Sequence, residues 1–234
     1  MNNEQVLSVR QQYGAYAGLS LTVLGLTAIL LPGASASFCR FLGGADPILV
    51  VFGAAVTGWA ALGVLRKQGG YEILRGRTTL RGMIVAAVLA TVMGFAIVVA
   101  DLLLRYPANI NVPWPEALLF YPAIGFVAEI FFHVVPLALL MLLCSPLSRR
   151  WTEDRFGWIA IICVAALEPI FQVTFDRGPF DRLDAYTIIH VFVFALLQLW
   201  VFRRYDFFSM YGFRLWYYAY WHLLWGVLRL EWLF

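Results

Sequence analysis

Six polar side chains lie inside long apolar stretches of this chain, where an ionisable group is costly and usually has a function. They are Glu129, His133, Glu168, Gln172, His190 and His222. Glu129 and His133 are four residues apart and therefore share one helix face, and Glu168 and Gln172 repeat that spacing. Pro169 directly follows Glu168 and removes a helical hydrogen bond, so we expect the helix to loosen one turn before it.

A buried carboxylate beside an imidazole is suited to proton transfer, because burial and a neighbouring imidazolium act in opposite directions on its proton affinity. Such a pair can take a proton from water and deliver hydroxide to a carbonyl, while a second histidine donates to the oxyanion. This chemistry predicts Glu129 or Glu168 as the base, His133 or His190 as its assistant, and His222 as the oxyanion donor. Glu129 and His133 can also pair simply to offset the cost of burial.

Seven continuous apolar runs must position these groups. They cover residues 14–31, 47–65, 83–104, 115–144, 156–175, 185–202 and 213–234. A helix needs roughly 20 apolar residues to cross a hydrocarbon core about 30 Å thick. The chain is 62% hydrophobic and only 13% charged, with a mean hydropathy of +0.78, whereas soluble domains are about 45–50% apolar.

The sequence therefore predicts an all-α, polytopic membrane helical bundle of about seven transmembrane helices, as a single domain over residues 1–234. Continuous runs are unlike the alternating strands of an outer-membrane barrel. Pro122 and Pro136 allow the fourth run to kink or to split into two crossings. At the depths expected from a helical rise of about 1.5 Å per residue, the polar groups could converge on one cavity.

The cationic residues predict the orientation. The richer side holds Arg10, Arg66, Lys67, Arg75, Arg77, Arg81, Arg149, Arg150, Arg155, Arg203, Arg204 and Arg214, and the poorer side holds Arg40, Arg105, Arg177, Arg182 and Arg229. This asymmetry places the amino terminus in the cytoplasm and the carboxyl terminus outside. The net charge of +3 is thus a topology signal and not a nucleic-acid footprint. Asp101 is expected to reach the interface at the end of its span.

Other motifs are weaker. The first run, followed by Ala34, Ser35 and Ala36, has the order of a signal peptide and its cleavage site, although the run is longer than usual. Gly14 and Gly18 form a GxxxG pattern that we expect to serve ordinary helix packing. The cysteines are Cys39, Cys144 and Cys163; their spacing forms no metal or redox motif, and we expect them to be small apolar filler.

The segments around Glu129, His133 and His222 resemble the motifs of a known family. The segment from Phe126 to His133 resembles the first signature of the CPBP intramembrane proteases, E-E-x-x-x-R, with Glu129 as the second glutamate and His133 at the arginine. His222 resembles the histidine of the H-x-x-x-N/D signature, with Gly226 at its last position. The F-x-x-x-H signature is similar either to residues 168–172 or to residues 186–190. The resemblance covers roughly residues 80–230, a CPBP-like core.

This resemblance implies an intramembrane peptidase acting on a membrane-anchored or prenylated peptide, and membrane lipid as its surroundings. In the family the first glutamate and the second-signature histidine are held to activate water, and the third-signature His and Asn to steady the oxyanion. Ala128 stands where the first glutamate belongs. A non-catalytic relative that serves as a membrane binding or regulatory protein is therefore an alternative.

A third hypothesis is a redox or proton carrier. His133, His190 and His222 could ligate a haem, and Glu129 and Glu168 with a histidine could hold a divalent metal. No haem-attachment motif is present, so only a b-type haem would fit. The sequence itself requires no cofactor, and it specifies neither the substrate nor the oligomeric state.

Overall fold

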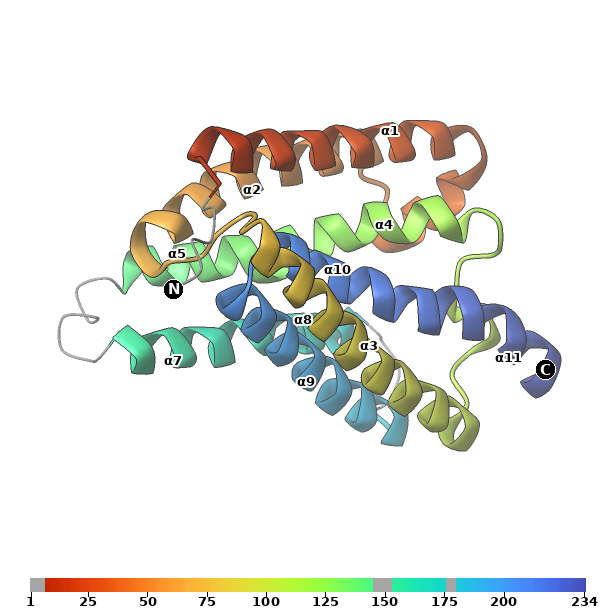
Figure 1. The fold of residues 1–234 in the computed structure, drawn as a ribbon. Helices are drawn as coiled ribbons and strands as arrows, with labels where there is room; N and C mark the ends of the chain where they lie inside the picture. The colour runs from red at the N-terminus through yellow and green to blue at the C-terminus, as the bar shows by residue number, and fades with distance from the viewer. Residues whose placement is uncertain (1–6, 145–152, 176–179) are drawn as a thin grey trace.

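The computed structural model describes residues 7–144, 153–175 and 180–234, and throughout these ranges the regular elements are helices. In chain order they are α1 (Val9–Leu42), α2 (Pro47–Gly69), α3 (Arg77–Leu104), the short 3-10 turn η1 (Ala108–Ile110), α4 (Ala117–Ala128), the π-helical η2 (Glu129–Val134), α5 (Val135–Leu143), α7 (Glu153–Ala165), α8 (Leu167–Phe175), α9 (Arg182–Arg204), α10 (Phe207–Tyr218), the π-helical η3 (Ala219–Leu224) and α11 (Trp225–Leu233). The predicted all-α bundle is confirmed (Figure 1).

Within the described ranges, six helical segments are long and apolar enough to cross a membrane. They are Val9–Leu31, Pro47–Gly69, Arg77–Leu104, Ala117–Leu143, Arg155–Thr174 and Arg182–Arg204. The seventh predicted run, 213–234, corresponds to most of a continuous helical segment from α10 to α11 that begins at Phe207 and ends at Leu233. It is not among the six, because its charged and aromatic side chains lower its hydropathy. Its crossing of the membrane stays a prediction.

Side-chain caps and glycines define several helix ends. The Ser8 side chain caps α1 together with Gln11, and the Asp46 side chain caps α2, whose first residue is a proline. Gly43 and Gly70 end α1 and α2 in the left-handed conformation, which glycine adopts without steric cost. Helix α1 continues through residues 34–36, the predicted cleavage motif, and ends at Leu42.

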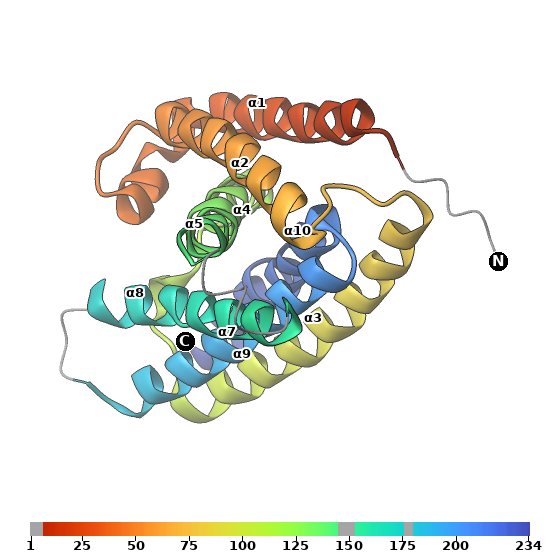
Figure 2. The same cartoon turned by 90° about the vertical axis from the view of Figure 1, so that its left-hand side faces the viewer.

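The helices pack as two groups around a central one. Helix α1 packs on α2 and α4, and α2 packs on α5; Figure 1 shows this group along the top of the molecule. Helix α10 contacts α3, α4 and α9, while α7 and α8 pack on α9. Figure 2 shows α3, α9, α7 and α8 on the opposite side from α1, with α10 between the two groups. Polar residues on α10 can therefore reach both groups.

Prolines shape the two helices that carry the predicted carboxylates. The fourth run is one continuous helix from Ala117 to Leu143, so its proposed division into two crossings is wrong. The π-helical η2 precedes Pro136, and the Val135 amide donates to a carbonyl five residues back, that of Ile130. The fifth run breaks between α7 and α8 at Ala166, just before Pro169, as the sequence predicts.

Three further predictions concern single residues. Gly14 and Gly18 lie on the outer face of α1, where an added Cβ would meet no other atom, so their expected packing role inside the chain is wrong. Gln172 is exposed on α8 and does not join Glu168 in the interior. Arg149, Arg150 and Arg177, which contributed to the predicted orientation, lie outside the described residues.

Candidate functional site

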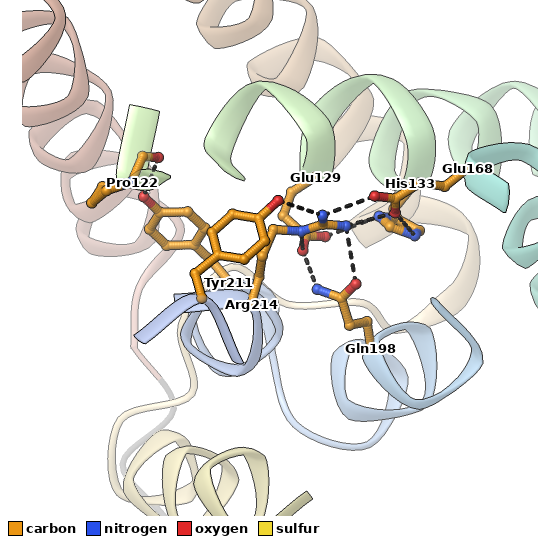
Figure 3. A network of polar contacts seen from close by, with 8 residues as sticks. Pro122, Glu129, His133, Glu168, Gln198, Tyr211 and Arg214 are labelled. Carbon is orange, nitrogen blue, oxygen red and sulfur yellow. Dashed lines mark hydrogen bonds and ion pairs between the residues drawn. The ribbon is translucent and has the colours of Figure 1, made fainter. Parts of the chain in front are cut away.

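Arg214 of α10 joins the two predicted carboxylates at the centre of the bundle. Its Nε donates to Glu129 Oε1 at 2.6 Å, and its Nη1 and Nη2 donate to the two oxygens of Glu168 at 2.9 and 2.7 Å. Gln198 of α9 accepts from Nη2 at 3.1 Å and donates to Glu129. Figure 3 shows the guanidinium between the carboxylates, with His133 beside Glu168. These five residues form what we call the Arg214 cluster.

His133 adds electrostatic contacts to the cluster. Its Nδ1 lies 3.0 Å from Glu129 Oε2 and its Nε2 lies 3.6 Å from Glu168 Oε2. Neither contact has hydrogen-bond geometry, since Glu129 Oε2 and both ring nitrogens lack a hydrogen-bond partner. All members of the cluster are buried. Two carboxylates and one guanidinium leave a net negative charge, so the cluster is neutral only when it holds one further proton, on His133 or on a carboxyl.

The geometry of the cluster is that of a buried, hydrogen-bonded ion-pair network, and it leaves no carboxylate open to a substrate. Both carboxylates accept charge-assisted hydrogen bonds from Arg214, which are roughly twice as strong as neutral ones. Neither carboxylate is therefore free to take a proton from water without losing this partner. The guanidinium also occupies the space between Glu129 and Glu168 where a metal ion would lie (Figure 3). Among the residues that the structure describes, no group of three His, Cys, Asp or Glu side chains is arranged to hold a metal.

Sequence reasoning missed two members of this cluster. Arg214 was counted among the cationic residues of the richer side, yet it is buried in a helix that begins earlier than expected. The signal was present in Asp206, a good N-cap residue, whose side chain accepts from the Ser209 amide and starts α10. Gln198 lies in an apolar run of α9 and could have been counted among the intramembrane polar residues.

His190 lies apart from the Arg214 cluster. Its Nδ1 is 3.1 Å from the hydroxyl of Tyr186 and its Nε2 is 3.0 Å from the hydroxyl of Tyr217, so both nitrogens have partners. Eight positions of α9 separate His190 from Gln198, which is about 12 Å of helix. The expected convergence of His190 with Glu129 is therefore wrong.

His222 lies in a second place, at the π-helical η3. Its Nδ1 is 2.6 Å from Asn111 Oδ1, and its ring stacks on Tyr121 with the centroids 4.0 Å apart. Eight positions separate it from Arg214, again about 12 Å of helix. Tyr218 lies between the two, because its hydroxyl accepts from Arg214 Nη1 at 3.0 Å and its ring contacts His222. The three histidines thus have separate partners and do not converge on a haem.

Asn111 reaches His222 from the segment between α3 and α4, residues 105–116, which we call the strap. The absence of a side chain at Gly226 makes room for it: a Cβ there would lie only 2.9 Å from Asn111 Nδ2. That Nδ2 is buried and has no hydrogen-bond partner. The Val112 amide donates to the Tyr121 hydroxyl at 2.9 Å and ties the strap to α4.

A buried ion pair holds the start of the strap. Arg229 of α11 binds both oxygens of Asp101 at 2.7 and 2.9 Å, and Asp101 also accepts from the Trp225 indole and the Tyr106 amide. The same guanidinium donates to the carbonyls of residues 106–108 and so ties the start of the strap to α11. Asp101 is fully buried, so its expected exposure at the interface is wrong. Arg229, which was assigned to the outer side, is likewise buried.

A pocket of about 610 Å³, which we call the strap pocket, lies between the strap, the end of α1 and α11. It is open to the outside of the molecule. Its lining includes His222 and Asn111 at one wall, apolar side chains of the strap and α11, and Arg40 and Glu231. Its size is in the range of small-molecule sites, about 300–1,000 Å³. Neither carboxylate of the Arg214 cluster lines it.

Burial raises the pKa of two tyrosines that lie outside the membrane-spanning helices. Burial raises the pKa of Tyr106 in the strap to about 12, and its hydroxyl lies 2.9 Å from that of Thr187. Burial also raises the pKa of Tyr71, between α2 and α3, to about 12. Both phenols therefore stay neutral at physiological pH.

The chain matches no protein-family model, no curated protein and no solved structure.

Proposed function

We propose that the protein is a non-catalytic membrane binding protein whose strap pocket holds an amphipathic molecule of the membrane. One observation carries the proposal: the pocket lies at His222, whereas the carboxylates suited to base catalysis are bound to Arg214, about 12 Å away along the helix. A hydrolytic site needs its base within hydrogen-bond reach of the water beside the substrate, or one water away. The Arg214 cluster then serves to fasten α10 to the helices of Glu129 and Glu168.

The described cationic residues support the orientation of the chain that the sequence predicts. Three regions at one end of the bundle hold several of the described cations: the end of α2, the segment before α3 and the end of α9. They supply Arg66, Lys67, Arg75, Arg203 and Arg204. The Arg75 guanidinium donates to the carbonyls of Gly70 and Arg204, which supports a single cationic face. By the positive-inside rule this face is cytoplasmic, the carboxyl terminus is outside, and the strap pocket opens toward the outer leaflet.

Photo-crosslinking tests the proposal. The full-length protein is reconstituted in vesicles that contain a phosphatidylcholine with a diazirine in its acyl chain, and the labelled peptides are identified. We expect enriched labelling of the strap and α11. Val227→Trp, which places a large side chain in the pocket, should remove this enrichment. Val92→Trp is the matched control, because Val92 is exposed on α3 and does not line the pocket. Labelling of the strap and α11 that is equal in both variants would contradict the proposal.

A CPBP-like intramembrane peptidase is the second candidate, and the position of Asn111 favours it. The family signature pairs a histidine with an asparagine four residues later, where this chain has Gly226. Asn111 lies against Gly226 and bonds His222, so a residue from the strap supplies an equivalent His–Asn pair. Incubation with a membrane-anchored reporter peptide tests this candidate. Cleavage by the wild type that is lost in His222→Ala, Glu129→Gln and Glu168→Gln would support it, and no cleavage, or retained activity in all three variants, would exclude it.

A further inference from the structure

Two charged side chains without an ionic partner face the strap pocket from different helices. Arg40 comes from the last turn of α1, and Glu231 comes from α11. Arg40 donates to the carbonyl of Asn109 and lies 5.5 Å from the ring centroid of Phe41, and no carboxylate of the described residues pairs with it. Glu231 is exposed and forms no ion pair with Arg40 or with another described cation. The pocket thus offers one cation and one anion that do not neutralise each other.

The remaining lining is mainly apolar. Val112 and Trp114 contribute from the strap, and Val227 and Leu230 contribute from α11. Trp114 is 60% exposed, as expected for a tryptophan that contacts lipid at the membrane interface. An occupant that matches this lining has an apolar part of considerable size and a head with both charges.

We infer that the strap pocket binds a zwitterionic phospholipid, with its phosphate at Arg40, its ammonium group at Glu231 and an acyl chain along the strap and α11. The inference rests on the proposed function and names the class of its ligand. Arginine suits the phosphate because its guanidinium can donate two hydrogen bonds to one phosphate group. An anionic phospholipid or a fatty acid has no cationic group that could pair with Glu231. A cationic lipid would place its positive charge beside that of Arg40, which is repulsive.

Native mass spectrometry of the full-length protein in detergent tests the inference. The protein is titrated with phosphatidylcholine and with phosphatidylglycerol of the same acyl chains, and the bound fractions are compared. An exposed charge pair contributes up to about 1 kcal/mol, so we expect the wild type to prefer phosphatidylcholine by about fivefold. Glu231→Gln should abolish this preference, because only phosphatidylcholine loses a partner. Arg40→Gln should weaken the binding of both lipids, because both carry the phosphate.

Matched controls lie at the same end of the bundle. Arg105 and Glu116 are the first and last residues of the strap, and they do not line the pocket. Arg105→Gln and Glu116→Gln should therefore leave the ratio of the two lipids unchanged. Arg40 also donates a hydrogen bond to the strap, so its replacement can disturb the pocket itself. Glu231→Gln is therefore the decisive variant, because the Glu231 side chain forms no hydrogen bond or ion pair with another described residue.

The outcomes separate this inference from the function on which it rests. If the wild type binds both lipids equally, and Val227→Trp removes that binding, the pocket binds amphiphiles but the zwitterion assignment is overturned. If a lipid preference is present but is unchanged in Glu231→Gln, the assignment is likewise overturned. If no lipid binding responds to Val227→Trp, both the ligand class and the proposed binding function fail.

Discussion

Replacing Arg214 by methionine should destabilise the protein strongly, and removing the two carboxylates in the same molecule should restore most of the loss. Methionine keeps the length and apolar body of the side chain but removes the guanidinium. Glu129 and Glu168 then lose hydrogen bonds of 2.6 to 2.9 Å while they stay buried. The second variant combines Arg214→Met with Glu129→Gln and Glu168→Gln, which preserves shape and removes the charge.

The expected magnitude follows from the burial of all three groups. Removing one partner of a buried ion pair costs about 3–5 kcal/mol, chiefly because an uncompensated charge remains inside. Here two carboxylates share the lost guanidinium, so we expect the single variant to lose about 5 kcal/mol. For a chain of this size each kcal/mol corresponds to roughly 2–4 °C, which predicts a fall in Tm of about 10–20 °C. The triple variant should recover at least about 2 kcal/mol, since replacing all the charges is often nearly neutral.

Thermal unfolding of the purified protein in detergent measures both effects, with size-exclusion chromatography to confirm that each variant is folded. Arg182→Met is the matched control, because Arg182 is exposed in the first turn of α9. It should change stability by less than about 0.5 kcal/mol. A loss below about 1 kcal/mol in Arg214→Met would refute the reasoning. So would a triple variant whose loss equals the sum of the three single losses, since residues that interact do not behave additively.

Other consequences of the structure can be measured in the same way. Gly82→Ala should lose about 1–3 kcal/mol because its Cβ would overlap the Ser209 side chain of the facing helix α10. Gly18→Ala, whose Cβ meets no neighbouring side chain, should not destabilise the protein, and equal losses would contradict the packing of α3 on α10. Asp101→Asn should cost about 3–5 kcal/mol by leaving Arg229 without its charge partner, and protease accessibility of the strap should rise with it; an unchanged strap would contradict the role of this pair. Burial raises the Tyr71 pKa to about 12, so its stabilising contribution is present below pH 10 and is lost as pH rises toward 12. Tyr71→Phe should reduce that alkaline loss with little cost at neutral pH, because the hydroxyl is buried without a hydrogen-bond partner; an unchanged alkaline profile would contradict this account.

Much of the helical architecture can be read from one-dimensional patterns. The apolar runs predict the spans because each is long enough for the bilayer, and helices satisfy their backbone hydrogen bonds locally. Pro169 predicts the break between α7 and α8 for the same local reason, since a proline cannot donate to the preceding turn. Glu129 and His133 lie together as their spacing predicts, although the helix there is π-helical.

The polar sites depend on which helices are neighbours, and sequence spacing carries no such information. Glu129 and Glu168 are brought together by Arg214 from a third helix, and nothing in their own segments indicates this partner. Asp101 and Arg229 are similarly far apart in the chain and adjacent in the bundle. His190 and His222 had the residue types expected for the site, but their positions along α9 and η3 place them near other partners.

Local hydrogen bonding and the apolar requirement of the bilayer act within one segment, and so the helical class and the approximate spans of this protein follow from its sequence. A buried charge is stabilised instead by whichever opposite charge the packing brings within a few ångströms. The pairing of Arg214 with two carboxylates arises only when α10 lies between the two helix groups. The Asn111–His222 contact and the strap pocket arise only when η3 and α11 pack beside the strap.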